Sequence, residues 1–202
     1  MASSTLRPGR AARASSAVAL LLAVIPGGPL AAQAPAESGK RPMTFLDVQE
    51  MRRAGSFAPS PDGRRMLYTV SFPDWKEARR QSDIFLVSLE DGLPSTRQMT
   101  FTDKKDETNP TWSPDGSFFI FASNREAPAN AGNQRQLYLM RPDGGEARRI
   151  TDAKDGVSDF AFSRDGKWLV YRSGKSGEER LYRLPVEGID SAEAEALPKH
   201  PT

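Results

Sequence analysis

Aspartates at regular intervals are the first candidates for chemistry in this sequence. Asp62, Asp115 and Asp165 each lie in a Ser-x-Asp-Gly phrase, and successive aspartates are 53 and 50 residues apart. Aspartates can act as metal ligands or as general bases, but one aspartate per repeat places each on a separate structural unit. Pro, Asp and Gly are also the residues that a tight turn before a strand requires. We therefore interpret the three phrases as turns.

A second candidate is Gly174-Lys175-Ser176, which is similar to the end of a phosphate-binding loop. That motif requires a glycine at position 169, where this chain has Leu169, and a helix after it. The flanking residues favour strands instead, so the segment is interpreted as a turn that connects two strands.

An acidic cluster is the third candidate. Asp103, Asp106 and Glu107 offer oxygen ligands of the kind that calcium prefers, but Lys104 and Lys105 interrupt them. The spacing fits no known calcium loop, and we expect a solvent-exposed connection between repeats.

Acyl-transfer chemistry has little support in these residues. No G-x-S-x-G phrase occurs, and the one histidine, His200, lies close to the end of the sequence. A histidine that acts as a general base must be held by a third group and aimed at a nucleophile. We predict that the chain contains no catalytic, cofactor-binding or metal-binding residue, and that it uses no cofactor.

The elements around the three turns repeat as well. Each turn is followed by two strand-like runs, and a further turn at Asp91-Gly92 or Asp143-Gly144-Gly145 leads to a short last strand. The runs are 66–70 and 83–87, 118–122 and 136–140, and 168–171 and 180–184. A repeat of about 50 residues with four strands is one propeller blade. The predicted fold class is all-β, a partial β-propeller of about three four-stranded blades, preceded by a signal peptide and a short helix.

Residues 1–36 are predicted to be a secretory signal peptide. They combine a basic start, an apolar core at 17–25 and the cleavage phrase Ala34-Pro35-Ala36. The core is too short for a stable membrane span, so we expect a periplasmic or secreted protein; an uncleaved N-terminal anchor is the alternative.

Residues 37–54 are predicted to form a linker and a short helix, and residues 55–202 the incomplete propeller. Thr44 has the residue type of a helix cap. We expect the apolar residues Phe45, Leu46, Val48 and Met51 to pack beneath the propeller.

The charge balance argues against nucleic-acid binding. Without the first 36 residues, which contain three arginines and no acidic residue, the formal net charge falls from +2 to −1. A nearly neutral chain without a basic face has little electrostatic attraction for DNA or RNA.

These residues carry a family resemblance. The chain resembles the N-terminal β-propeller region of a prolyl oligopeptidase-family serine peptidase of the acylaminoacyl-peptidase or dipeptidyl-peptidase-like type, with TolB-like propeller repeats. The matching segments are Met43-Thr44-Phe45-Leu46-Asp47, Asn109 to Gly116 with Gln136-Leu137-Tyr138-Leu139, and Gly144 to Thr151.

The resemblance implies that the propeller precedes a C-terminal α/β-hydrolase domain that is missing here, and that it filters the peptide substrates of that domain. The chain would then be the non-catalytic part of an exported serine peptidase. The alternative is a TolB-like periplasmic propeller that binds a protein partner and has no enzymatic activity.

The number of blades raises a third possibility. Propellers close with four to eight blades, and about three leave two open edges that invite association. A three-blade product would complete its ring by self-association through these edges.

Overall fold

The computed structural model describes residues 41–127 and 134–198. The predicted signal peptide at residues 1–36 and His200 lie outside the described residues. The contacts divide the chain at Pro42, and every element below belongs to the unit that begins at Met43. Among the described residues, no helix has both the length and the apolar character that crossing a bilayer requires.

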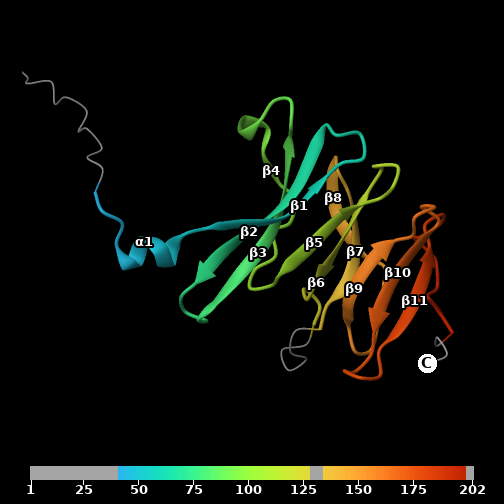
Figure 1. Cartoon of the computed structure of the whole chain (residues 1–202). Helices are drawn as coiled ribbons and strands as arrows, with labels where there is room; N and C mark the ends of the chain where they lie inside the picture. The colour runs from blue at the N-terminus through green and yellow to red at the C-terminus, as the bar shows by residue number, and fades with distance from the viewer. Residues whose placement is uncertain (1–40, 128–133, 199–202) are drawn as a thin grey trace, which may run out of the picture. The chain divides into compact units, whose positions relative to one another are not determined.

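The described residues form three four-stranded antiparallel sheets, which confirms the prediction of about three propeller blades (Figure 1). In each sheet the strands pair in the order in which they occur in the chain. Blade 1 contains β1 (Arg53–Pro59), β2 (Arg65–Asp74), β3 (Arg79–Ser88) and β4 (Arg97–Gln98); blade 2 contains β5 (Glu107–Trp112), β6 (Phe119–Ser123), β7 (Gln136–Arg141) and β8 (Gly144–Arg149); blade 3 contains β9 (Val157–Phe162), β10 (Trp168–Ser173), β11 (Arg180–Pro185) and β12 (Glu195–Ala196). A short 3-10 helix, η1 (Leu93–Ser95), lies between β3 and β4.

The same aromatic pair crosses the two central strands of every blade. Tyr68 lies opposite Phe85 in blade 1, and Phe121 lies opposite Tyr138 in blade 2, with ring centroids 5.7 and 5.9 Å apart. In blade 3 the pair is Tyr171 and Tyr182, at 5.3 Å. Cross-strand aromatic pairs stabilise a sheet and fix its register, so the repeat in sequence is a repeat in structure.

Strand β6 joins the three sheets, because it is buried on both faces. Successive side chains of a strand point to opposite faces. Phe119 and Phe121 pack in one apolar cluster with residues of blade 1, whereas Ile120 and Ala122 pack in a second cluster with residues of blade 3. Blade 2 therefore lies between blades 1 and 3, face to face with each.

The predicted short helix is present as α1 (Phe45–Glu50). Thr44 caps it as expected: its hydroxyl accepts a hydrogen bond from the Asp47 amide, and the Asp47 carboxylate accepts one from the Thr44 amide. The expected burial is wrong, since the side chains of Phe45 and Leu46 are 74% and 64% exposed, and Val48 and Met51 are exposed as well. Six residues make fewer than two helical turns, which is too short to lay an apolar stripe along a sheet.

The double burial of blade 2 can be tested with two leucines. Leu137 on β7 is fully buried between blades 2 and 3, whereas Leu93 in η1 is 80% exposed. We expect Leu137→Ala to lower the free energy of unfolding by about 2–5 kcal/mol, because it leaves a cavity between the sheets. Leu93→Ala should change it by less than about 0.5 kcal/mol. Urea unfolding followed by tryptophan fluorescence measures both, and equal effects would contradict the packing described here.

Candidate functional site

The three Ser-x-Asp-Gly phrases form turns of the same geometry. In each, the serine hydroxyl donates to the aspartate Oδ1, at 2.5 Å in Ser60–Asp62, 2.7 Å in Ser113–Asp115 and 2.6 Å in Ser163–Asp165. The same Oδ1 accepts from the backbone amide two residues further on. These bonds, first the one from serine, hold the pKa of each aspartate below its ordinary value of 3.8. The aspartates are turn residues, as the sequence predicted.

The turns also touch one another from blade to blade. A Cβ atom added to Gly166 would lie 3.2 Å from Pro114, and one added to Gly116 would lie 3.5 Å from Pro61. Both glycines have positive φ, so two separate constraints favour glycine there. The proline of each turn thus packs against the glycine of the next, and Arg164 takes the proline position in blade 3.

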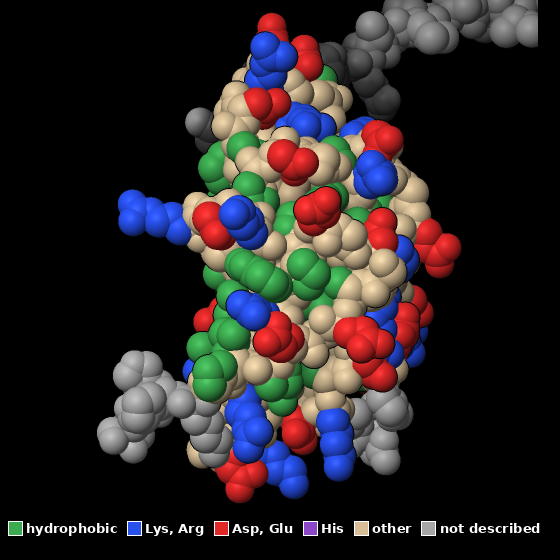
Figure 2. Space-filling model, turned by 90° about the vertical axis from the view of Figure 1, so that its right-hand side faces the viewer, with side chains coloured by type: hydrophobic (Ala, Val, Ile, Leu, Met, Phe, Trp, Pro, Cys, Tyr) green, Lys and Arg blue, Asp and Glu red, His purple; other side chains and the backbone are tan. Residues whose placement is uncertain are grey.

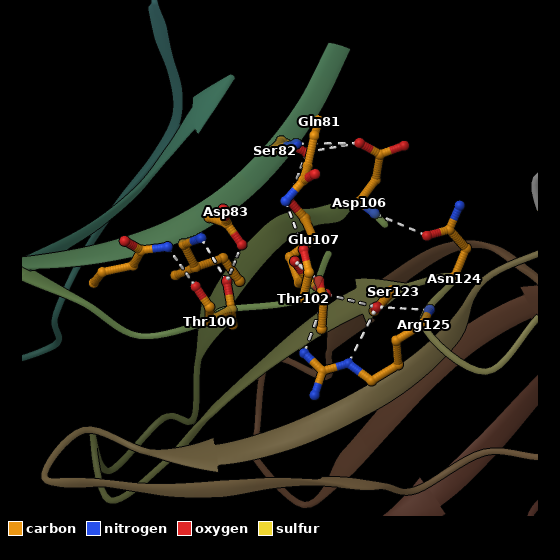
Figure 3. A network of polar contacts seen from close by, with 12 residues as sticks. Gln81, Ser82, Asp83, Thr100, Thr102, Asp106, Glu107, Ser123, Asn124 and Arg125 are labelled. Carbon is orange, nitrogen blue, oxygen red and sulfur yellow. Dashed lines mark hydrogen bonds and ion pairs between the residues drawn. The ribbon is translucent and has the colours of Figure 1, made fainter. Parts of the chain in front are cut away.

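A network of polar side chains lies where blade 1 meets blade 2 (Figure 3). Its centre is Glu107, the first residue of β5, whose side chain is fully buried. The Glu107 carboxylate accepts hydrogen bonds from the Thr102 hydroxyl at 2.6 Å and the Ser123 hydroxyl at 2.9 Å, and it pairs with the Arg125 guanidinium at 3.2 Å. A buried charge is tolerated only when it is paired and hydrogen-bonded in this way.

Arg125 connects this polar site to the aromatic core of blade 2. Its guanidinium carbon lies 4.7 Å from the ring centroid of Tyr138 and 5.2 Å from that of Phe121. Arginine over an aromatic face gains further electrostatic attraction when water is excluded. One side chain therefore satisfies Glu107 and covers the aromatic pair of blade 2.

The acidic cluster has a different role from the one expected. The sequence suggested a solvent-exposed connection, but Glu107 is buried, and the Asp106 carboxylate accepts from the Ser82 amide at 3.1 Å. The Asp106 amide donates to the Asn124 side chain at 2.8 Å. The expectation holds only for Asp103, which is exposed. Among residues 41–127 and 134–198, no group of three acidic, histidine or cysteine side chains is placed to bind a metal ion.

A threonine near the last strand makes the same two hydrogen bonds in blade 1 and in blade 2. The Thr100 hydroxyl donates to Asp83 Oδ1 at 3.2 Å and accepts from the Ile84 amide at 2.9 Å. In blade 2, Thr151 makes the same two bonds with Gln136 and the Leu137 amide. Blade 1 thus has a carboxylate where blade 2 has a neutral amide. Burial, and then the negative charge of Glu107, raises the pKa of Asp83 to about 6.

The hydrogen bonds and the ion pair of this site hold blade 1 and blade 2 together. Its serine and threonine hydroxyls donate to carboxylates, and no described residue is an imidazole that could activate them. Gly174-Lys175-Ser176 lies between β10 and β11, as a strand-connecting turn should. The prediction that the chain has no catalytic, cofactor-binding or metal-binding residue stays a prediction, because His200 lies outside the described residues.

Asp83 gives the network a testable dependence on pH. Because its pKa is higher in the folded protein than its ordinary value of 3.8, the folded state binds this proton more tightly than the unfolded state. The Asp83 contribution to the free energy of unfolding is therefore largest below pH 4 and falls as the pH rises to about 6.

Asp83→Asn keeps an oxygen that can accept from Thr100 and removes the charge, as Gln136 does in blade 2. We expect the variant to lose the decline between pH 4 and pH 6 and to be about 1–3 kcal/mol more stable than the unsubstituted chain at pH 7. Urea unfolding at a series of pH values measures this, with the exposed Asp103→Asn as the matched control. An unchanged decline in Asp83→Asn would contradict the assignment.

Comparison with known proteins adds sequence relatives. The chain is 29% identical over 148 residues to dipeptidyl-peptidase 5 of Porphyromonas endodontalis, an alignment that covers 73% of this chain and 19% of that protein. It is 37% identical over 113 residues to the uncharacterized peptidase YuxL of Bacillus subtilis, which covers 55% of this chain and 16% of that protein. The chain thus spans less than a fifth of the length of these relatives. No family model matches it.

Solved structures show the same fold at low sequence identity. The β-propeller domain of the Trilobed protease from Pyrococcus furiosus matches with a TM-score of 0.55 and 14% identity, over 75% of this chain and 45% of that one. The acylaminoacyl peptidase of Pyrococcus horikoshii matches with a TM-score of 0.55 and 15% identity, over 75% of this chain and 26% of that one. TolB from Acinetobacter baumannii matches with a TM-score of 0.50 and 24% identity, over 71% and 32%. The chain therefore resembles the β-propeller region of prolyl oligopeptidase-family peptidases and has TolB-like propeller repeats.

Proposed function

We propose that the chain is the non-catalytic N-terminal propeller segment of an exported serine peptidase of the prolyl oligopeptidase family. In this proposal its blades control the access of peptides to an α/β-hydrolase domain encoded outside these 202 residues. The observation that carries the proposal is the sequence similarity to dipeptidyl-peptidase 5 and to peptidase YuxL over a segment that folds as stacked blades.

The order of the strands supports a gating role. Strands β1, β5 and β9 each form the same edge of their sheet, and β1 lies in contact with β5. In a propeller, the first edges of the blades converge on a central channel. Such a channel admits an extended peptide and excludes a folded protein, because its width is set by the blades and not by the substrate.

Export rests on the first 36 residues. Their basic start, apolar core and small-residue cleavage phrase are those of a secretory signal peptide, and we propose cleavage after Ala36 and a periplasmic or secreted location. The partners in this proposal are the hydrolase domain and its peptide substrates.

A TolB-like binding propeller without enzymatic activity is the second candidate. The likeness to TolB from Acinetobacter baumannii favours it at the level of the fold, and the Ser-x-Asp-Gly blade turns suit either protein. The two functions differ in what must follow the propeller, since only the peptidase requires a nucleophile elbow and a catalytic triad.

The native gene separates the two. We expect its reading frame to continue beyond the codon for Thr202, through further blades, into a G-x-S-x-G phrase followed by an aspartate and a histidine. The encoded protein should then react with a fluorophosphonate probe at that serine, and serine→alanine at that position should abolish the labelling. A stop codon directly after Thr202, or a continuation without the elbow, would refute the peptidase proposal and favour the binding propeller.

A further inference from the structure

A cavity of about 420 Å³ lies at the end of blade 1 where β2 turns into β3. Its walls come from α1, from the start of β1 and from the hairpin that joins β2 to β3. Figure 1 shows α1 beside the tip of this hairpin, and α1 and β2 are in contact. All the lining residues lie between positions 49 and 80, so the cavity is built by one blade and the helix before it.

The hairpin around this cavity is longer than the repeat requires. Strands β2 and β3 have 10 residues each, whereas the central strands of blades 2 and 3 have 5 or 6. The first central strand of every blade begins directly after its Ser-x-Asp-Gly turn, so the additional residues of blade 1 lie at the opposite end. The extension ends in Trp75, which is 53% exposed and gives the cavity a large apolar wall.

The charged side chains around the cavity are unbalanced. Three of the lining residues are arginines, Arg53, Arg79 and Arg80, and one is an acid, Asp74, which is an excess of two positive charges. The two signs are mixed on the side of the molecule that carries blade 3, where Figure 2 shows acidic and basic side chains interspersed. A local excess of arginine favours an anionic ligand.

Arg80 holds the cavity in shape. Its Nε donates to the Ser71 hydroxyl at 2.9 Å, and its Nη2 donates to the backbone carbonyls of Met51 and Ser71, both at 2.8 Å. Because Met51 directly follows α1, these bonds fasten the end of the helix to the hairpin. The walls are therefore in place before a ligand binds.

The other two arginines have donors that remain free. Arg79 Nε lies 3.8 Å from Asp74 Oδ2, a long ion pair, and Arg79 Nη2 is buried without a hydrogen-bond partner among the described residues. Arg53 is exposed and makes no hydrogen bond or ion pair with any described residue. A buried donor without an acceptor costs free energy, and a guanidinium presents its donors in a fork that fits a carboxylate. A carboxylate in the cavity would supply the acceptor.

We propose that this cavity binds the carboxylate of a ligand that also has an apolar group, as the C-terminus of a peptide with a large apolar last residue does. The Arg53 and Arg79 guanidinia bind the carboxylate, and Trp75 contacts the apolar group. The chemistry of the site stands on the cavity alone. The identification of its ligand as a peptide rests on the proposed function.

Isothermal titration calorimetry on the full chain tests the two halves of the ligand. We expect N-acetylphenylalanine to bind with a Kd of about 1 mM, as suits a ligand of this size. N-acetylphenylalaninamide lacks the charge and acetate lacks the ring, so each should bind at least about tenfold more weakly. Equal affinity of either one would overturn the proposal, as would the absence of N-acetylphenylalanine binding. Tighter binding of inorganic phosphate would overturn the assignment to a carboxylate.

Substitutions in the cavity locate the site. Arg53→Met and Arg79→Met should each weaken N-acetylphenylalanine binding about tenfold or more, because each removes a charged donor. Arg53 has no partner to lose, so its variant should fold, which circular dichroism verifies. The matched control is Arg164→Met, an exposed arginine in the turn of blade 3, which should bind as the unsubstituted chain does. An unchanged affinity in Arg53→Met, or an equal loss in Arg164→Met, would overturn the proposal.

Asp74→Asn tests the sign of the effect. It removes the one carboxylate that lines the cavity, so N-acetylphenylalanine should bind about two- to fivefold more tightly. Weaker binding in this variant would contradict a site for an anion. All of these outcomes are independent of the reading frame beyond Thr202, which tests the peptidase proposal separately.

Discussion

The packing of one sheet on the next, on both sides of blade 2, is the interaction on which the rest of this structure depends. An antiparallel sheet with apolar residues on both faces has to cover both, and β6 does so with alternate residues in two different clusters. The turns of successive blades also approach each other closely, at Pro61–Gly116 and at Pro114–Gly166. The fold is therefore additive, with each blade stabilised mainly by its neighbours, as in other repeat architectures.

The interface of blades 1 and 2 has an apolar end and a polar end. Trp112 and Phe119 lie opposite each other near the Ser-x-Asp-Gly turn, and Glu107 and Ser123 lie opposite each other at the far end of the same strands. The apolar end supplies most of the stabilisation. At the polar end, the free energy needed to remove the Glu107 carboxylate from water offsets much of what its hydrogen bonds and ion pair contribute. The polar end favours one register, because a shift of one residue would leave Glu107 without the hydroxyls and the guanidinium that satisfy it.

The sequence was sufficient for the repeat but not for the interface. The Ser-x-Asp-Gly turns and the two central strands of each blade follow from turn chemistry and from aromatic and branched residues, which act locally. The first strands were harder to identify, because β1 and β5 contain bulges at Ser56 and Asn109 with positive φ that interrupt the alternation. Glu107 looked solvent-exposed because its neighbours are charged; its burial depends on Ser123 and Arg125, which only the fold brings close. Thr100 and Thr151 make equivalent hydrogen bonds in blades 1 and 2, but neither contacts Glu107 and so neither could have predicted its burial.

Hydrogen exchange of the backbone amides tests the central claim most directly. Strands β2, β6 and β10 are each paired on both sides within their own sheets, and β6 is the one whose residues are all buried. The amides of β6 should exchange most slowly, because both faces of blade 2 must be uncovered before they open. Exchange in β2 or β10 that is as slow as in β6 would contradict the account, since the stability of a blade would then not depend on its neighbours.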